Sequence, residues 1–213
     1  MSEQVRIVEV GPRDGLQNEK TLVSAEARIA FIEALVGAGL HSVEVGAFVS
    51  PKAIPQMVNS DQVLRGVSHL PGEFHVLVPN EKGYEASQQA GARVIAVFAS
   101  ASEGFSRANI NCSVAESIER FKPVLARAKA DGIKVRGYIS CVLGCPFDGE
   151  VMPQAVVDVA PRRCGISAAT KSRSATPSGS ARRLRHGICC ARWPAPCQWP
   201  ISPCIFTTPT GRR

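Results

Sequence analysis

The sequence lacks three features that would each place it in a different class of protein. Among its 213 residues there is no run of about 18 apolar residues, which argues against a transmembrane helix. The opening MSEQVRIVEV has no basic segment followed by an apolar stretch, so we expect no secretory signal, a cytoplasmic location and reduced cysteines. No GxGxxG loop follows the first expected strand, which disfavours a dinucleotide-binding fold. With 45% hydrophobic and 20% charged residues, the chain can nevertheless bury a core.

Acidic residues are also missing from the last quarter of the chain. From residue 159 onward there are ten Lys and Arg but no Asp or Glu, whereas residues 1–158 carry fifteen basic and eighteen acidic residues, a net charge of −3. Five of the eight cysteines, seven of the fifteen prolines and both tryptophans lie in that same last quarter. This sharp change predicts two parts, an α/β part at residues 1–160 and a basic, disordered tail at residues 161–213.

Strand and helix patterns alternate through the first part. Apolar runs predict strands at 5–10, 42–48, 74–78, 93–99 and 135–141. Helical spacing predicts helices after Ser24, at 83–89, at 113–130 and within 150–159. Strands separated by helices indicate a parallel sheet, either a TIM barrel or a doubly wound sheet. In a TIM barrel the polar residues that follow each strand would gather at one mouth.

The segment GPRDGLQN, residues 11–18, carries the most chemical information. Arg13 and Asp14 follow directly on an apolar strand. A carboxylate is a hard oxygen ligand for a divalent cation, and a guanidinium is a rigid partner for a carboxylate or a developing oxyanion. A plain turn is the alternative interpretation, because Gly-Pro and Asp-Gly are both turn dipeptides.

Four longer strings extend this signal, namely GPRDGLQNEK, SVEVGAFVSPKAIPQM, FASASEGFSRANINCS and VRGYISCVLGCPFDGE. Together they resemble hydroxymethylglutaryl-CoA lyase over residues 5–158. The resemblance implies a TIM (β/α)8 barrel, of which this chain holds about the first five β/α units. It also implies metal-assisted cleavage of 3-hydroxy-3-methylglutaryl-CoA into acetyl-CoA and acetoacetate, with Mg²⁺ or Mn²⁺ as cofactor.

The resemblance further assigns roles to individual residues. Asp14 would bind the metal, Arg13 would stabilise the enolate, and Glu44 would be a catalytic or supporting carboxylate, although a single acid in a strand commonly faces solvent. Four further residues would contact substrate alongside Arg13, and for each of them a capping or surface role stays open: Gln17, Asn109, Ser113 and Arg136. The expected partner is an acyl-CoA, with neither nucleic acid nor membrane as a partner, and intact relatives would form homo-oligomers. Cys141 and Cys145 would be structural thiols.

Beyond residue 160 the resemblance ends, and the family's metal-binding histidine pair does not appear. Shifting the reading frame by one base permits YEISLGDTIG within residues 169–179 and HFHDTYGQ within residues 204–212, which are both strings of the family. We therefore hypothesise a frameshift between about Val157 and Cys164. A chain with so incomplete a barrel and metal site is expected to be inactive or nearly so.

Two other functions remain open at this point. The first is an acetyl-CoA-dependent Claisen-type synthase of the same superfamily, which would make the carbon–carbon bond instead of breaking it. The second is a non-enzymatic protein whose basic tail, with ARRLRH at 181–186, binds nucleic acid.

Overall fold

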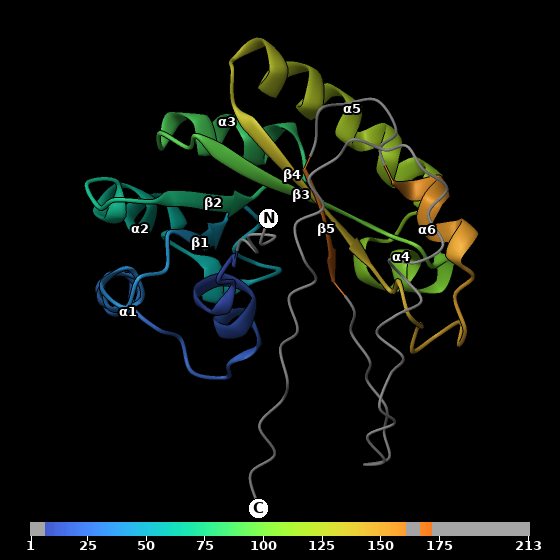
Figure 1. Cartoon of the computed structure of the whole chain (residues 1–213), viewed down its shortest axis with the longest axis horizontal. Helices are drawn as coiled ribbons and strands as arrows, with labels where there is room; N and C mark the ends of the chain where they lie inside the picture. Colours follow the sequence, from blue (N-terminus) through green and yellow to red (C-terminus); the bar gives the residue numbers. More distant parts are fainter. Residues whose placement is uncertain (1–6, 161–166, 172–213) are drawn as a thin grey trace, which may run out of the picture.

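A five-stranded parallel sheet forms the centre of the computed structural model, which describes residues 7–160 and 167–171 (Figure 1). Neighbouring strands pair in the order in which they occur along the chain. The strands are β1 (Ser42–Ala47), β2 (Glu73–Leu77), β3 (Val94–Ser100), β4 (Lys134–Ser140) and β5 (Ser167–Lys171).

The strand order distinguishes between the two folds predicted from the sequence. A doubly wound sheet reverses direction at a switch point, whereas a (β/α)8 barrel adds each strand beside the previous one. Here all four pairings are parallel and consecutive, from β1 to β5. Glu9 extends this order at the other edge, where it forms a parallel bridge with Val43. The structure is therefore part of a (β/α)8 barrel, and among the described residues no pairing joins β5 back to the Glu9 segment.

Helices follow most strands, and serine or asparagine side chains start several of them. The Ser24 hydroxyl accepts the Ala27 N–H at 3.2 Å, and Ser113 forms a capping box with Glu116. The helices are α1 (Ala25–Gly37), α2 (Ser60–Val67), α3 (Glu81–Gln89), α4 (Glu103–Ile110), α5 (Val114–Ala130) and α6 (Pro153–Val159), with short helical turns η1 (Gly11–Gly15), η2 (Leu16–Asn18) and η3 (Pro55–Met57). No helix among these residues is long and apolar enough to cross a membrane.

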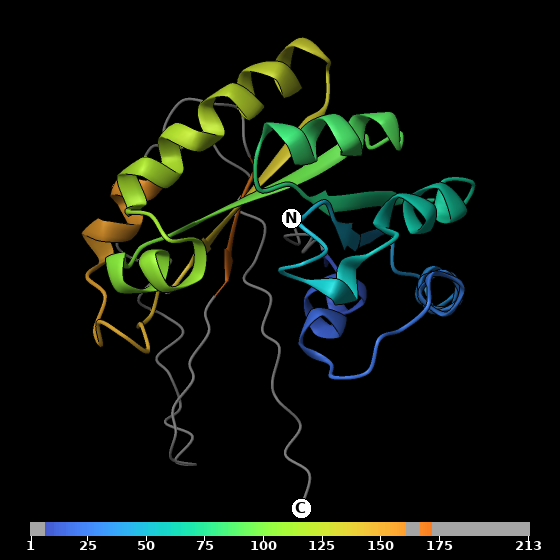
Figure 2. The same cartoon turned by 180° about the vertical axis from the view of Figure 1, so that it is seen from behind.

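Alternate residues of each strand face opposite sides of the sheet. The outer face packs against the helices through Val43, Val45, Val76, Val78, Ile95 and Val97, all nearly inaccessible to solvent. Figures 1 and 2 show α3 and α5 on the same side of the curved sheet. The inner face carries the intervening residues, including Glu44, Ala96 and Tyr138. The outer face therefore holds the main hydrophobic core.

One buried cation connects three segments of the N-terminal part. The Arg28 side chain of α1 is completely buried and donates to the carbonyl oxygens of Val45 and Val58, each at 3.0 Å. Its Nη2 also lies 3.4 Å from the Ser60 hydroxyl. Burial lowers the pKa of Arg28, and both of its terminal nitrogens are hydrogen-bonded, whereas its Nε has no partner among the described residues. Arg28 thus joins α1, β1 and the start of α2.

The structure differs from the sequence prediction in four elements. Within the described residues, the expected first strand is reduced to the single bridge at Glu9, because the chain turns into η1 immediately afterwards. Helices α2 and α4 were not predicted; each is only eight residues long. Strand β5 lies inside the predicted tail, since SAATK has no apolar run to reveal it and pairs with β4 through the backbone. The rest of that tail, and with it most of the proposed frameshifted segment, lies outside the described residues.

Candidate active site

Arg13 and Asp14 lie in a tight turn directly after the Glu9 bridge. The backbone N–H groups of Arg13, Asp14 and Gly15 all point to the Val10 carbonyl oxygen, at 3.1, 2.7 and 3.4 Å. The turn predicted from Gly-Pro and Asp-Gly is therefore present. The turn also buries a charged side chain, because Arg13 is only 6% exposed.

A buried cluster forms where Arg13 meets the inner face of the sheet. Its Nη2 lies 3.0 Å from Oε2 of Glu44 in β1, and its Nη1 lies 3.0 Å from Oδ1 of Asp14. The hydroxyl of Tyr138 in β4 donates to the same Glu44 Oε2 at 3.0 Å. Glu44 is completely buried, so the solvent-facing alternative for this residue is wrong. The cluster thus brings together residues separated by up to 125 positions in the chain.

The charges of the cluster support one another. Burial alone would lower the pKa of Arg13, but the neighbouring Glu44 and Asp14 carboxylates outweigh it and raise the pKa. Burial also raises the pKa of Tyr138, and the adjacent Glu44 carboxylate raises it further. Arg13 therefore stays cationic and Tyr138 stays a neutral hydrogen-bond donor at physiological pH. This arrangement provides a fixed positive charge and a proton-bearing hydroxyl on either side of one carboxylate.

Several buried polar atoms of the candidate site residues have no hydrogen-bond partner within residues 7–160 and 167–171. They are Nε of Arg13, Oε1 of Glu44, Oε1 of Gln17, and Nε and Nη2 of Arg136. Arg136 is 5% exposed, and its guanidinium lies 5.5 Å from the centre of the Tyr138 ring. Buried polar groups are normally paired, so these atoms point to a polar ligand. Arg136 and Tyr138, two residues apart in β4, face the same side of the sheet.

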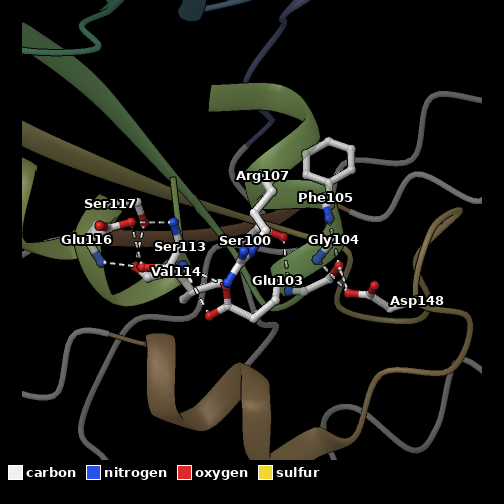
Figure 3. Close-up of polar contacts among 11 residues, drawn as sticks. Ser100, Glu103, Gly104, Phe105, Arg107, Ser113, Val114, Glu116, Ser117 and Asp148 are labelled. Atoms are coloured by element: carbon white, nitrogen blue, oxygen red, sulfur yellow. Dashed lines mark hydrogen bonds and ion pairs between the residues drawn. The ribbon is translucent and has the colours of Figure 1, made fainter. Parts of the chain in front are cut away.

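Asn109 and Ser113, also predicted to contact substrate, lie elsewhere. Asn109 is an exposed residue of α4. Ser113 is the N-cap of α5, where its backbone N–H and hydroxyl both bond the Glu116 carboxylate (Figure 3). No contact of the described residues joins either one to the Arg13 cluster. The capping alternative accounts for Ser113, and a substrate contact by either residue stays a prediction.

Asp14 is the one predicted metal ligand. Its carboxylate is 14% exposed and lies beside the charged Arg13. Within residues 7–160 and 167–171, no three His, Cys, Asp or Glu side chains come together as a metal site. Since Mg²⁺ and Mn²⁺ take about six ligands, the described residues can supply one ligand of such a site and do not complete it.

Tyr138 was missed in the sequence, although it is central to the site. A signal was present, because it stands two residues after Arg136 in an apolar strand and so shares a face with it. Its contact with Glu44, 94 residues away, could not be read from local patterns.

The parallel sheet is in barrel order, and a buried Arg–Glu–Tyr cluster with a neighbouring aspartate lies against its inner face, so the described residues form part of a (β/α)8 barrel with a polar cluster inside it. Residues 4–171 match the HMGL-like family, and the chain belongs to that family.

The relatives are lyases by name. The chain is 57% identical over 161 residues to the hydroxymethylglutaryl-CoA lyase of Pseudomonas mevalonii, covering 75% of this chain and 54% of that protein. The crystal structure of the Pseudomonas aeruginosa hydroxymethylglutaryl-CoA lyase matches with a TM-score of 0.76 at 50% identity, over 79% of this chain and 57% of that one. An HMG-CoA lyase from Acinetobacter baumannii, solved with coenzyme A and 3-methylmalate, gives a TM-score of 0.74 at 30% identity. This match covers 78% of this chain and 56% of that one. The chain thus spans about half the length of the relatives it matches, and the predicted family and barrel fold are confirmed.

Proposed function

We propose that the catalytic unit to which this sequence belongs cleaves 3-hydroxy-3-methylglutaryl-CoA into acetyl-CoA and acetoacetate. The observation that carries the proposal is the buried contact of Glu44 Oε2 with both Arg13 and Tyr138. The proposal is supported by proteins that are similar to this chain in sequence or in structure and are named hydroxymethylglutaryl-CoA lyases. The cytoplasmic location expected from the sequence stays a prediction.

Arg13 would supply the electrostatic part of the reaction. Breaking the bond between C2 and C3 leaves an enolate on the acetyl-CoA half, whose oxygen carries the developing negative charge. A buried guanidinium of fixed orientation stabilises such a charge, and Nε of Arg13 has no hydrogen-bond partner in the described part of the chain. Glu44 would hold Arg13 in place through Nη2, and the Tyr138 hydroxyl would hold Glu44.

The other polar atoms would orient the substrate. Gln17 Oε1 and the Nε and Nη2 atoms of Arg136 are buried without a hydrogen-bond partner among the described residues, so we assign them to the polar groups of the acyl chain. Asp14 would be one ligand of a divalent cation, Mg²⁺ or Mn²⁺, which would polarise the substrate oxygens when bound. Because the remaining ligands are not among the described residues, we propose that this chain by itself turns over little or no substrate.

A chimera tests whether the described residues support the lyase reaction once the rest of the barrel is supplied by a relative. Residues 1–160 would be joined to the segment of the Pseudomonas mevalonii lyase that follows its matched region. With Mg²⁺ or Mn²⁺ we expect this chimera to release acetoacetate, whereas the 213-residue chain should release almost none. Replacing Arg13 with Gln should lower kcat about 10²–10³-fold, the loss typical of one oxyanion donor.

The control is Arg65→Gln in the same chimera, because Arg65 is exposed and paired only with Asp61. It should leave kcat unchanged. A folded chimera that condenses acetyl-CoA with a 2-oxo acid, but cleaves nothing, would favour the synthase alternative. Cleavage by the 213-residue chain at the rate of the chimera would refute the proposed inactivity. Salt-sensitive nucleic-acid binding by the full chain, without cleavage by the chimera, would favour the non-enzymatic alternative.

A further inference from the structure

Two cysteines lie together in the loop that follows β4. Cys141 directly follows the strand with a left-handed backbone, φ 62°, and Cys145 begins a small hairpin closed by paired backbone bonds to Gly149 at 2.7 and 2.9 Å. Both thiols are free, and each lies close enough to affect the ionisation of the other. Cys141 is completely buried, whereas Cys145 is 8% exposed.

The surroundings of Cys145 favour its thiolate. The Ser102 hydroxyl donates to Cys145 Sγ at 2.8 Å, and the Phe147 N–H donates to it at 3.3 Å. Burial opposes ionisation, but these hydrogen bonds outweigh it and lower the pKa of Cys145. Burial, followed by the neighbouring Cys145, raises the pKa of Cys141 to about 11. One sulfur is thus prepared as a nucleophile, and the sulfur beside it keeps its proton.

We propose that Cys141 and Cys145 form a peroxide-reactive dithiol, in which Cys145 is oxidised first and Cys141 then closes an intramolecular disulfide. The proposal rests on the placement of two free thiols in one short loop, and on the Ser102 and Phe147 donors that bond Cys145 Sγ. It does not depend on the lyase reaction.

The chemistry balances with a hydroperoxide as the oxidant. The Cys145 thiolate attacks one oxygen of hydrogen peroxide, the O–O bond breaks, and sulfenic acid and hydroxide form. The Cys141 sulfur then attacks the Cys145 sulfur, forming the S–S bond and breaking the S–O bond. The leaving hydroxide takes the Cys141 proton as water. In sum, two thiols and one peroxide give one disulfide and two waters.

The oxidised loop would have to rearrange. Moving Cys145 Sγ toward Cys141 removes it from Ser102 and Phe147. Ser102 is also the N-cap of α4, where its hydroxyl accepts the Phe105 N–H at 3.0 Å and donates to Asp148 at 2.6 Å. Figure 3 shows the Asp148 carboxylate beside the first turn of α4, next to Gly104. Oxidation would therefore disturb the joint between the β4 loop and α4.

The test uses the full chain and needs no variant at first. Trypsin releases one peptide, 137–162, that contains Cys141 and Cys145 alone, and another, 108–120, that contains Cys112 alone. Cys112 is free and 5% exposed, and so serves as a matched buried thiol in the same molecule. After treatment with hydrogen peroxide and alkylation of the remaining thiols, mass spectrometry should find peptide 137–162 unalkylated and two hydrogens lighter. We expect it to react several-fold faster than Cys112, because the hydrogen bonds from Ser102 and Phe147 to Cys145 Sγ favour the thiolate of Cys145.

Variants then separate the two roles. In Cys141→Ser, the reaction should stop at sulfenic acid on Cys145, trapped by dimedone, and in Cys145→Ser, the Cys141 thiol should persist. In urea, Cys145 and Cys112 should be oxidised at similar rates, because unfolding removes the hydrogen bonds around Cys145. Equal oxidation of Cys112 and Cys145 in the native chain, or unchanged loss of the Cys141 thiol in Cys145→Ser, would overturn the proposal.

Discussion

The outer and inner faces of the sheet consist of alternate residues of the same strands, yet they differ in what they bury. The outer face buries valine and isoleucine against helices, and its members need nothing beyond close packing. The inner face buries Arg13, Glu44 and Arg136, whose desolvation is costly unless they are paired. The difference indicates that the outer face supplies stability, whereas the inner face holds buried polar atoms that no described residue pairs.

The largest effect should follow a change in the outer face. Ile95 is completely buried in the main core. Replacing it with Ala should lower the free energy of unfolding by about 2–5 kcal/mol, because it removes apolar contacts and leaves a cavity. Urea denaturation measures this change. Met152→Ala is the control, since Met152 is 66% exposed and should change stability by less than about 0.5 kcal/mol. Equal losses for both variants would contradict the division between the faces.

A smaller effect should come from the charge pair of the inner face. The variants Arg13→Gln and Glu44→Gln, alone and combined, form a double-mutant cycle. We expect a coupling energy of about 1–3 kcal/mol, because the pair is buried and lies 3.0 Å apart. The cycle of Arg65→Gln with Asp61→Asn is matched in distance, also 3.0 Å, but is exposed, so its coupling should be only about 0.3–0.5 kcal/mol. Urea denaturation at neutral pH measures both, and equal couplings would show that burial of the inner pair has no energetic consequence.

A third effect should be a change in the pH dependence of stability, caused by the buried thiol that directly follows β4. Folding raises the pKa of Cys141 from its ordinary value of 9.0 to about 11, chiefly through burial. Between these values the folded chain holds a proton that the unfolded chain releases, so stability should fall as the pH rises from about 9 to 11. Cys141→Ser should remove this part of the fall. Thermal denaturation of both proteins under reducing conditions, repeated between about pH 8 and 12, measures this difference. The same dependence of the melting temperature on pH in both proteins would contradict the prediction.

Local signals predicted much of the fold. Ser24 and Ser113 correctly marked the starts of α1 and α5, since a capping serine is followed by residues with helical spacing. Four expected strands correspond to β1–β4, because their apolar residues are frequent enough to be read as runs. The first expected strand, 5–10, is only a bridge at Glu9 within the described residues, and α2 follows Asn59 without a side-chain cap. An apolar run does not show how much of a segment pairs with a neighbouring strand, and a helix start without a capping side chain leaves no local signal.

The site was predicted in its first half only. The sequence pointed to the segment around Arg13 and Asp14, because charged residues directly after an apolar strand are costly to bury without a partner or a function. Tyr138 was missed because its partner, Glu44, is brought to it only when three intervening β/α units have formed. Ser113 matched the family string, but its local hydrogen bonds show what the string alone did not, namely a helix cap.

The contacts of Arg28 bear on the order in which this chain assembles. They join residues 17, 30 and 32 positions apart, whereas the Tyr138–Glu44 contact spans 94. Closing short loops loses less chain entropy than closing long ones, and local contacts form sooner. We therefore expect the contacts of Arg28 in the first quarter of the chain to form before Tyr138 reaches Glu44 and completes the buried cluster.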